Sequence, residues 1–106
     1  MTEPTYQIVR EASRVRLSGD LDINARDDVR DVLLRAVGDS ASDGHVRIVI
    51  DLADTAFIDS EAVGALIDGL TAGRAAGVPL AIAHAEGLVH RVLDVSGVLE
   101  LFEEVD

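Results

Sequence analysis

The sequence predicts an α/β fold in which a mixed β-sheet, begun by an N-terminal hairpin, is packed by helices. Two observations lead to this prediction. Residues 6–18 contain two short strand-like runs separated by a turn, which is typical of an antiparallel hairpin. From residue 24 onward, stretches with apolar residues at helical spacing alternate with short runs typical of buried strands. This alternation favours a sheet whose later strands are joined by right-handed helical crossovers.

The hairpin and the first helix account for the first 44 residues. The hairpin strands are predicted over residues 6–10 and 14–18. We expect the first helix to begin after Asn24, which is a favourable N-cap, and to end at Gly38. Residues 39–44 are rich in Ser, Asp and Gly, so a polar loop is predicted there.

The second half of the chain contains the remaining predicted elements. They are a strand over residues 46–51, a helix from Ser60 to Gly77, a strand over residues 78–83, a helix over residues 88–95 and an edge strand over residues 99–102. Gly69 and Gly73 fall inside the long helix. We interpret both as points of close packing against the sheet, because the segment lacks the lysine of a phosphate-binding loop.

The length of 106 residues suits one domain spanning residues 1–106, large enough to bury a single core. Hydrophobic residues make up 48% of the chain and aromatic residues only 3%, so we expect an aliphatic core. Every apolar segment is interrupted by a charged residue or a glycine, and the N-terminus lacks the features of a signal peptide. We therefore expect a soluble cytoplasmic protein without membrane contact.

The charge balance and the absence of cysteine exclude several classes of function. The formal net charge is −11, and all nine basic residues are arginine. A chain this acidic is a poor ligand for nucleic acid, and a charged protein partner is expected to present a basic surface. Without cysteine the chain has no disulfide, no thiolate metal ligand and no cysteine nucleophile.

Ser60 stands where a strand and a short loop give way to a helix, with Asp59 and Glu61 on its two sides. In open α/β sheets, loops that leave the carboxyl ends of strands form the working surface. The first N–H groups of a helix lack intrahelical partners, so a serine there can cap the helix and an added phosphate is favoured. We interpret Ser60 either as an ordinary cap or as a switch.

The sequence gives little support for catalysis, a cofactor or a metal site. A nucleophilic serine needs a base, but His45, His84 and His90 are scattered, and no G-x-S-x-G motif is present. The same histidines lack metal-site spacing. We interpret the acids of residues 51–59 as solvated loop residues in preference to a weak magnesium site. The predicted protein is therefore a non-enzymatic one.

Three motifs follow one another in a specific order. Residues 17–22 read Leu-Ser-Gly-Asp-Leu-Asp, residues 49–60 run from a buried strand into Phe-Ile-Asp-Ser, and residues 91–97 read Arg-Val-Leu-Asp-Val-Ser-Gly. This ordered set resembles the STAS domain of the anti-anti-sigma factor type, also called anti-sigma factor antagonist. The resemblance extends over nearly the whole chain.

The resemblance implies regulation by partner switching. Such proteins, when unphosphorylated, bind a serine-kinase anti-sigma factor and so free a sigma factor for transcription. The kinase uses ATP and magnesium to phosphorylate the serine after the aspartate, the complex separates, and a metal-dependent serine phosphatase restores the binding form. Carried over, Ser60 is the phosphorylation site. The implied partner-binding residues are Gly19, Asp22, Asp59, Ser60, Glu61 and Gly64.

Two positions depart from the family pattern, which commonly continues with serine or threonine and then glycine. This chain has Glu61 and Ala62 there. Glu61 is either a favourable acid in the first helical turn or a change in kinase recognition. These departures keep open a STAS subunit with a constitutive structural role in a larger assembly, such as a stress-signalling or lipid-transport complex. A kinase partner without any sigma factor, and a homodimer formed through an exposed helix face, also remain open.

Overall fold

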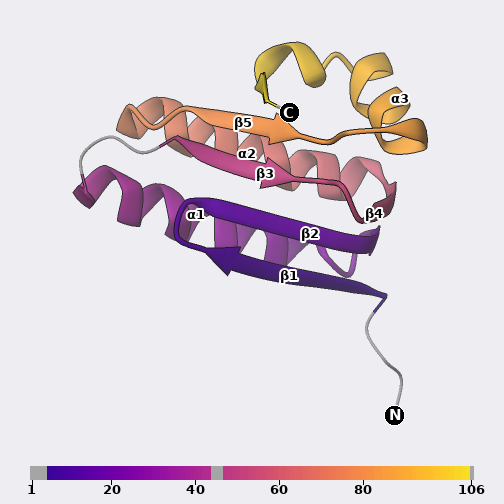
Figure 1. Ribbon diagram of the computed structural model, residues 1–106, viewed down its shortest axis with the longest axis horizontal. Helices are drawn as coiled ribbons and strands as arrows, with labels where there is room; N and C mark the ends of the chain where they lie inside the picture. Colours follow the sequence, from indigo (N-terminus) through magenta and orange to yellow (C-terminus); the bar gives the residue numbers. More distant parts are fainter. Residues whose placement is uncertain (1–4, 44–46, 106) are drawn as a thin grey trace.

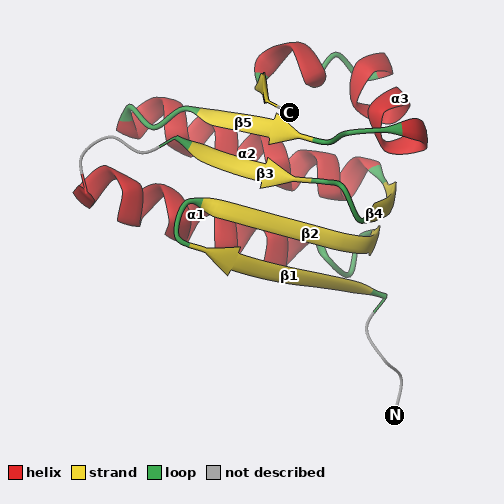
Figure 2. Cartoon of the chain, viewed as in Figure 1, coloured by secondary structure: helices red, strands yellow, loops and turns green. Residues whose placement is uncertain are grey.

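The computed structural model describes residues 5–43 and 47–105 and contains a mixed β-sheet packed by helices, which confirms the predicted fold class (Figures 1 and 2). The elements are β1 (Tyr6–Glu11), β2 (Arg14–Leu21), α1 (Arg26–Asp43), β3 (Ile48–Asp51), β4 (Thr55–Ile58), α2 (Ser60–Ala76), β5 (Leu80–Ala83), α3 (Gly87–Val95), the 3₁₀ helix η1 (Leu99–Leu101) and β6 (Glu103–Val105). No helix in these two ranges is long and apolar enough to cross a membrane.

The sheet follows the order β1-β2-β3-β5-β6, and β4 pairs with the carboxyl-terminal end of β2. β1 and β2 form the predicted antiparallel hairpin, whereas the pairs of β2 with β3, β3 with β5 and β5 with β6 are parallel. Parallel strands end at the same edge of a sheet. The segments that enter α1, α2 and α3 therefore leave from one edge, on the right in Figure 1.

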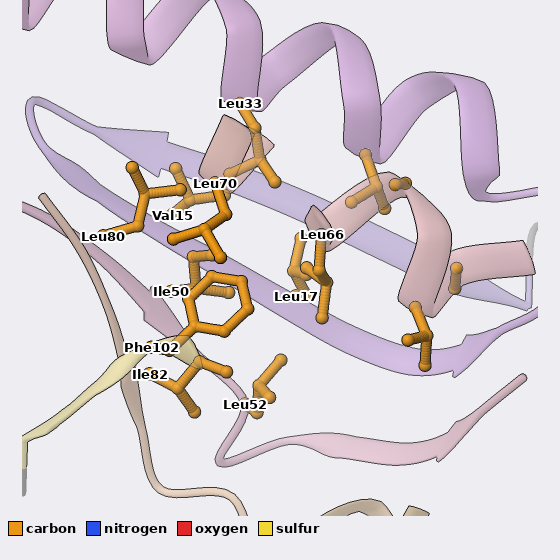
Figure 3. Packing of buried hydrophobic residues seen from close by; sticks show 14 of the residues in the cluster. Val15, Leu17, Leu33, Ile50, Leu52, Leu66, Leu70, Leu80, Ile82 and Phe102 are labelled. Atoms are coloured by element: carbon orange, nitrogen blue, oxygen red, sulfur yellow. The ribbon is translucent and has the colours of Figure 1, made fainter. Parts of the chain in front are cut away.

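The core lies between the sheet and the two long helices, which pack against each other along their length (Figure 1). It is aliphatic, as predicted, with Leu17, Ile50 and Leu66 fully buried. Phe102 is the exception, and Figure 3 shows its ring beside Ile82. Burial of each large apolar side chain contributes about 1.5–3 kcal/mol relative to exposure.

α1 is longer than predicted. It continues through Gly38 to Asp43, so the loop expected over residues 39–44 is helical as far as it is described, and residue 44 lies outside the described ranges. Burial and one hydrogen bond accompany the continuation of the helix. Val37 and Ser40 are buried, and the Ser42 hydroxyl donates to the Gly38 carbonyl oxygen at 3.1 Å. A glycine without an αL conformation does not end a helix.

Three strand predictions differ from the structure. The segment Thr55–Ile58, predicted as part of a loop, forms β4, in which Phe57 is exposed and Ile58 is buried. The edge strand predicted over residues 99–102 is wrong: Leu99–Leu101 form η1, and the edge strand is β6, which pairs with β5. The strand predicted from residue 46 begins at Ile48, and residue 46 lies outside the described ranges.

Gly69 and Gly73 of α2 pack closely, although not only against the sheet. A Cβ atom at Gly69 would lie 2.8 Å from Cδ1 of Leu33, which belongs to α1. A Cβ atom at Gly73 would lie 2.5 Å from the carbonyl oxygen of Val78, at the entry to β5. Both distances are shorter than van der Waals contact, so these glycines set how closely α2 approaches its neighbours.

Candidate functional site

The loop after β2 and the loop after β4 are joined by backbone hydrogen bonds at the carboxyl edge of the sheet. Leu21 and Ile58 are paired in parallel register, and the Asp59 amide donates to the Leu21 carbonyl oxygen at 3.0 Å. The Gly19 amide donates to the Asp54 carbonyl oxygen at 2.9 Å. The first and second sequence motifs, which lie some 40 residues apart, therefore form one continuous surface.

Asp59 is the N-cap of α2. Its backbone is extended, and its Oδ1 atom accepts hydrogen bonds from the amides of Glu61 and Ala62, each at 3.0 Å. Its carbonyl oxygen accepts from the Val63 amide at 2.9 Å. The aspartate satisfies the first turn of the helix by itself, so the interpretation of Ser60 as the cap is wrong.

Ser60 is the first residue of α2, and it is exposed. Its hydroxyl forms no hydrogen bond with any other described residue. Two of the first amides of α2, those of Glu61 and Ala62, already donate to Asp59 and are not free to receive a phosphate, while the positive end of the helix dipole still favours an anion. The expected anion site is thus less complete than the sequence indicated, while the hydroxyl is accessible.

Glu61 forms an ion pair that links the starts of the two long helices. Its Oε1 atom lies 2.7 Å from Nη1 of Arg26, the first residue of α1, and the two side chains are 43% and 44% exposed. The Nε atom of Arg26 lies 3.2 Å from Oδ1 of Asp27. Hydrogen bonding to Asp27, and then to Glu61, raises the pKa of Arg26.

The other residues implied by the resemblance have distinct environments. Gly19 has a φ of +83°, and a Cβ atom there would lie 2.3 Å from the Thr5 carbonyl oxygen, so a glycine is required. Asp22 accepts from the Asn24 amide at 2.9 Å and shapes the turn before α1. Around Gly64 a Cβ atom would meet nothing within 4 Å. Packing within the described chain therefore does not explain the glycine at position 64.

Sequence reasoning missed three exposed apolar residues on the elements that meet at this edge. Ile23 in the loop after β2 is 55% exposed, Phe57 in β4 is 40% exposed, and Leu88 at the start of α3 is 53% exposed. α3 packs against β4, which brings its first turn to the same edge (Figure 1). In the sequence Phe57 and Ile58 are adjacent apolar residues, so no local pattern separates the exposed side chain from the buried one. We call these three residues the apolar group.

Asp51 differs from the solvated loop acid that was expected. It is buried, and its Oδ2 atom lies 2.8 Å from Nη2 of Arg14 while Oδ1 accepts from the Ala53 amide at 3.0 Å. Burial pushes the pKa of Asp51 upward, but the Ala53 amide and the Arg14 guanidinium outweigh burial and hold it below the ordinary value. Within the described ranges, no three His, Asp or Glu side chains are grouped so that they could hold a metal ion.

A family model described as "MlaB, STAS domain" matches residues 5–103, so the chain belongs to the STAS domain family. No curated protein matches the chain. The anti-sigma factor antagonist SpoIIAA in its unphosphorylated form is 18% identical, with a TM-score of 0.71 over 95% of this chain and 88% of that one.

Two further solved structures share the fold. The Bacillus cell fate determinant SpoIIAA in its phosphorylated form is 17% identical, with a TM-score of 0.65 over 95% of this chain and 91% of that one. A proposed anti-sigma factor antagonist of Thermotoga maritima, TM1081, is 21% identical, with a TM-score of 0.67 over 95% and 86% of the two chains. At these identities the likeness establishes the fold that the three structures have in common.

Proposed function

We propose that this protein is an anti-sigma factor antagonist: it binds a serine-kinase anti-sigma factor and is released when Ser60 is phosphorylated. The observation that carries the proposal is the division of roles between Asp59 and Ser60. Asp59 caps α2, which leaves the exposed Ser60 hydroxyl without a structural role among the described residues. Fold likeness to an antagonist solved both with and without phosphate supports the same conclusion.

The chemistry at Ser60 is phosphoryl transfer in which the kinase supplies the reacting groups. A bond forms between Ser60 Oγ and the γ-phosphorus of ATP, the bond from that phosphorus to the bridging oxygen breaks, ADP leaves, and the hydroxyl proton is lost. The product adds about −1.5 to −2 charges beside Asp59 and Glu61. Repulsion and desolvation then weaken a closely packed complex, and a metal-dependent phosphatase reverses the change by hydrolysis.

The surface around Ser60 combines apolar side chains with carboxylates. Ile23, Phe57 and Leu88 offer apolar contact area, and an aromatic residue is a frequent source of binding energy in interfaces. A partner that covers this edge is expected to offer closely packed apolar pockets, in which an added phosphate would lose its water. Truncation of Phe57 is then expected to weaken binding.

Phosphate mapping tests the proposal. The purified protein is incubated with ATP and lysate of its native cells, and phosphate is located by peptide mass spectrometry. We expect modification at Ser60 and none in the Ser60→Ala variant. The matched control is Ser96→Ala, which removes another serine near a helix end and is expected to leave the modification intact. Absence of phosphate at Ser60 in the wild type would overturn the proposal that phosphorylation of this serine regulates binding.

One observation favours the alternative of a constitutive STAS subunit in a larger assembly. The Glu61 carboxylate already gives the start of α2 a negative charge next to Ser60, and Arg26 holds it in place. Because this negative charge is permanent, phosphorylation of Ser60 would change the charge at the start of α2 by a smaller proportion. Recovery of the same non-kinase assembly by the wild type and by Ser60→Asp would support this alternative.

A further inference from the structure

We propose that Arg26 is the positioning residue for the phosphate on Ser60, and that it exchanges Glu61 for the phosphate when the serine is modified. The inference rests on the proposed function and specifies the regulation of the same site. It concerns an ion pair made by Glu61, a residue at which this chain departs from the family pattern.

The contacts of Arg26 place a cation at the first turn of α2. Arg26 Nη1 lies 2.7 Å from Oε1 of Glu61, the residue that follows Ser60. The next interhelical pair along α1 joins Arg30 Nε to Oδ2 of Asp68 at 3.4 Å, two turns further into α2. Of these two bridges between the long helices, the first lies at the turn of α2 that contains Ser60.

Competition at this site favours the phosphate over Glu61. The amides of Glu61 and Ala62 donate to Asp59, so they are not free to solvate a phosphate. A phosphate carries more charge than a carboxylate and accepts two parallel hydrogen bonds from a guanidinium. The Arg26–Glu61 pair is nearly half exposed, and pairs of this kind contribute little to stability, so they exchange readily.

The exchange changes the charge that a partner meets. Glu61 loses its counter-ion at the moment when a phosphate is added beside it, so its carboxylate is left without a cationic partner. In the unmodified surface, by contrast, Glu61 is paired with Arg26, which also contacts Asp27. Release of a closely packed partner is then driven by desolvation of the freed carboxylate as well as of the phosphate.

The test uses the full chain with phosphoserine installed at position 60 during translation, so that no kinase is needed. Phosphorus NMR follows the second ionisation of the phosphate at low salt, in the parent protein and in Arg26→Gln, Arg26→Lys and Glu61→Gln backgrounds. The matched control is Arg30→Gln, which breaks the neighbouring interhelical pair of similar exposure. Circular dichroism checks that each variant is folded.

We expect Arg26→Gln to raise the midpoint of the phosphate titration by at least about 0.3 pH unit, because an opposite charge favours the dianion. Arg26→Lys should restore part of the difference, and Glu61→Gln should lower the midpoint by freeing Arg26. Asp59 and Asp27 raise the midpoint in every background, and Glu61 does so in every background except Glu61→Gln, so only the differences are compared. Equal midpoints for Arg26→Gln and Arg30→Gln would overturn the proposal, and they would leave the question of kinase binding to the phosphate-mapping experiment.

Discussion

Gly64→Ala is expected to stabilise the protein, and its magnitude can be worked from the structure. Gly64 lies inside α2, where glycine costs about 0.8–1 kcal/mol relative to alanine. A Cβ atom there meets nothing within 4 Å, so the methyl group neither clashes nor gains buried contacts. The free energy of unfolding should therefore rise by nearly the full propensity difference, which corresponds to a Tm increase of about 4–8 °C for a domain of this size.

The assay is urea and thermal unfolding followed by far-ultraviolet circular dichroism, with Gly73→Ala as the matched control in the same helix. A Cβ atom at Gly73 would lie 2.5 Å from the Val78 carbonyl oxygen, so this variant should lose about 1–3 kcal/mol through overpacking. A Gly64→Ala protein no more stable than the wild type would refute the reasoning. Partner capture on the same variant then shows whether the added methyl obstructs binding at the candidate surface.

Three further predictions concern the cap, the buried carboxylate and the apolar group. Asp59→Ala should lower the free energy of unfolding by about 1 kcal/mol, because the N-cap of α2 is lost. Ser60→Ala should change the same free energy by less than about 0.5 kcal/mol. Equal losses of the two variants in urea denaturation would contradict the assignment of Asp59 as the cap. The pKa of the Asp51 carboxyl group is lowered on folding, so this group should stabilise the protein fully above its ordinary pKa of 3.8. That stabilisation should be lost as the pH falls through the pKa of the folded state. Urea titrations of Asp51→Asn should lack this pH dependence. Phe57→Ser should weaken partner capture without lowering Tm, since the ring is 40% exposed, and a large fall in Tm would indicate a structural role instead.

The elements with strong local signals were predicted closely. The β1–β2 turn, the apolar stripe of α2 and the termination of that helix at Gly77, which has an αL backbone, all appear as expected. β4 was missed because its four residues gain strand structure from pairing with β2, which lies far away in the sequence. The end of α1 was missed because Gly38 does not adopt the αL backbone that ends a helix, and the helix continues past it to the buried Ser40 and beyond.

The position of Ser60 and Asp59 in the fold could be predicted from the sequence, but the role of each at the helix start could not. The motif placed Ser60 and Asp59 at a helix start, and only the hydrogen bonds show that the aspartate makes the cap. The partner of Glu61 is Arg26, which is separated from it by 35 residues, so no local pattern indicates the pair. The same holds for Ile23 and Leu88, whose exposure depends on how their elements meet β4.

The most direct test of the central proposal is affinity capture from native cell lysate with the wild type, Ser60→Ala and Ser60→Asp, read by mass spectrometry. We predict that the wild type and Ser60→Ala retain an ATP-binding serine kinase and that Ser60→Asp loses it, while all three have similar Tm values. Retention of one non-kinase assembly by all three proteins would contradict partner switching at Ser60.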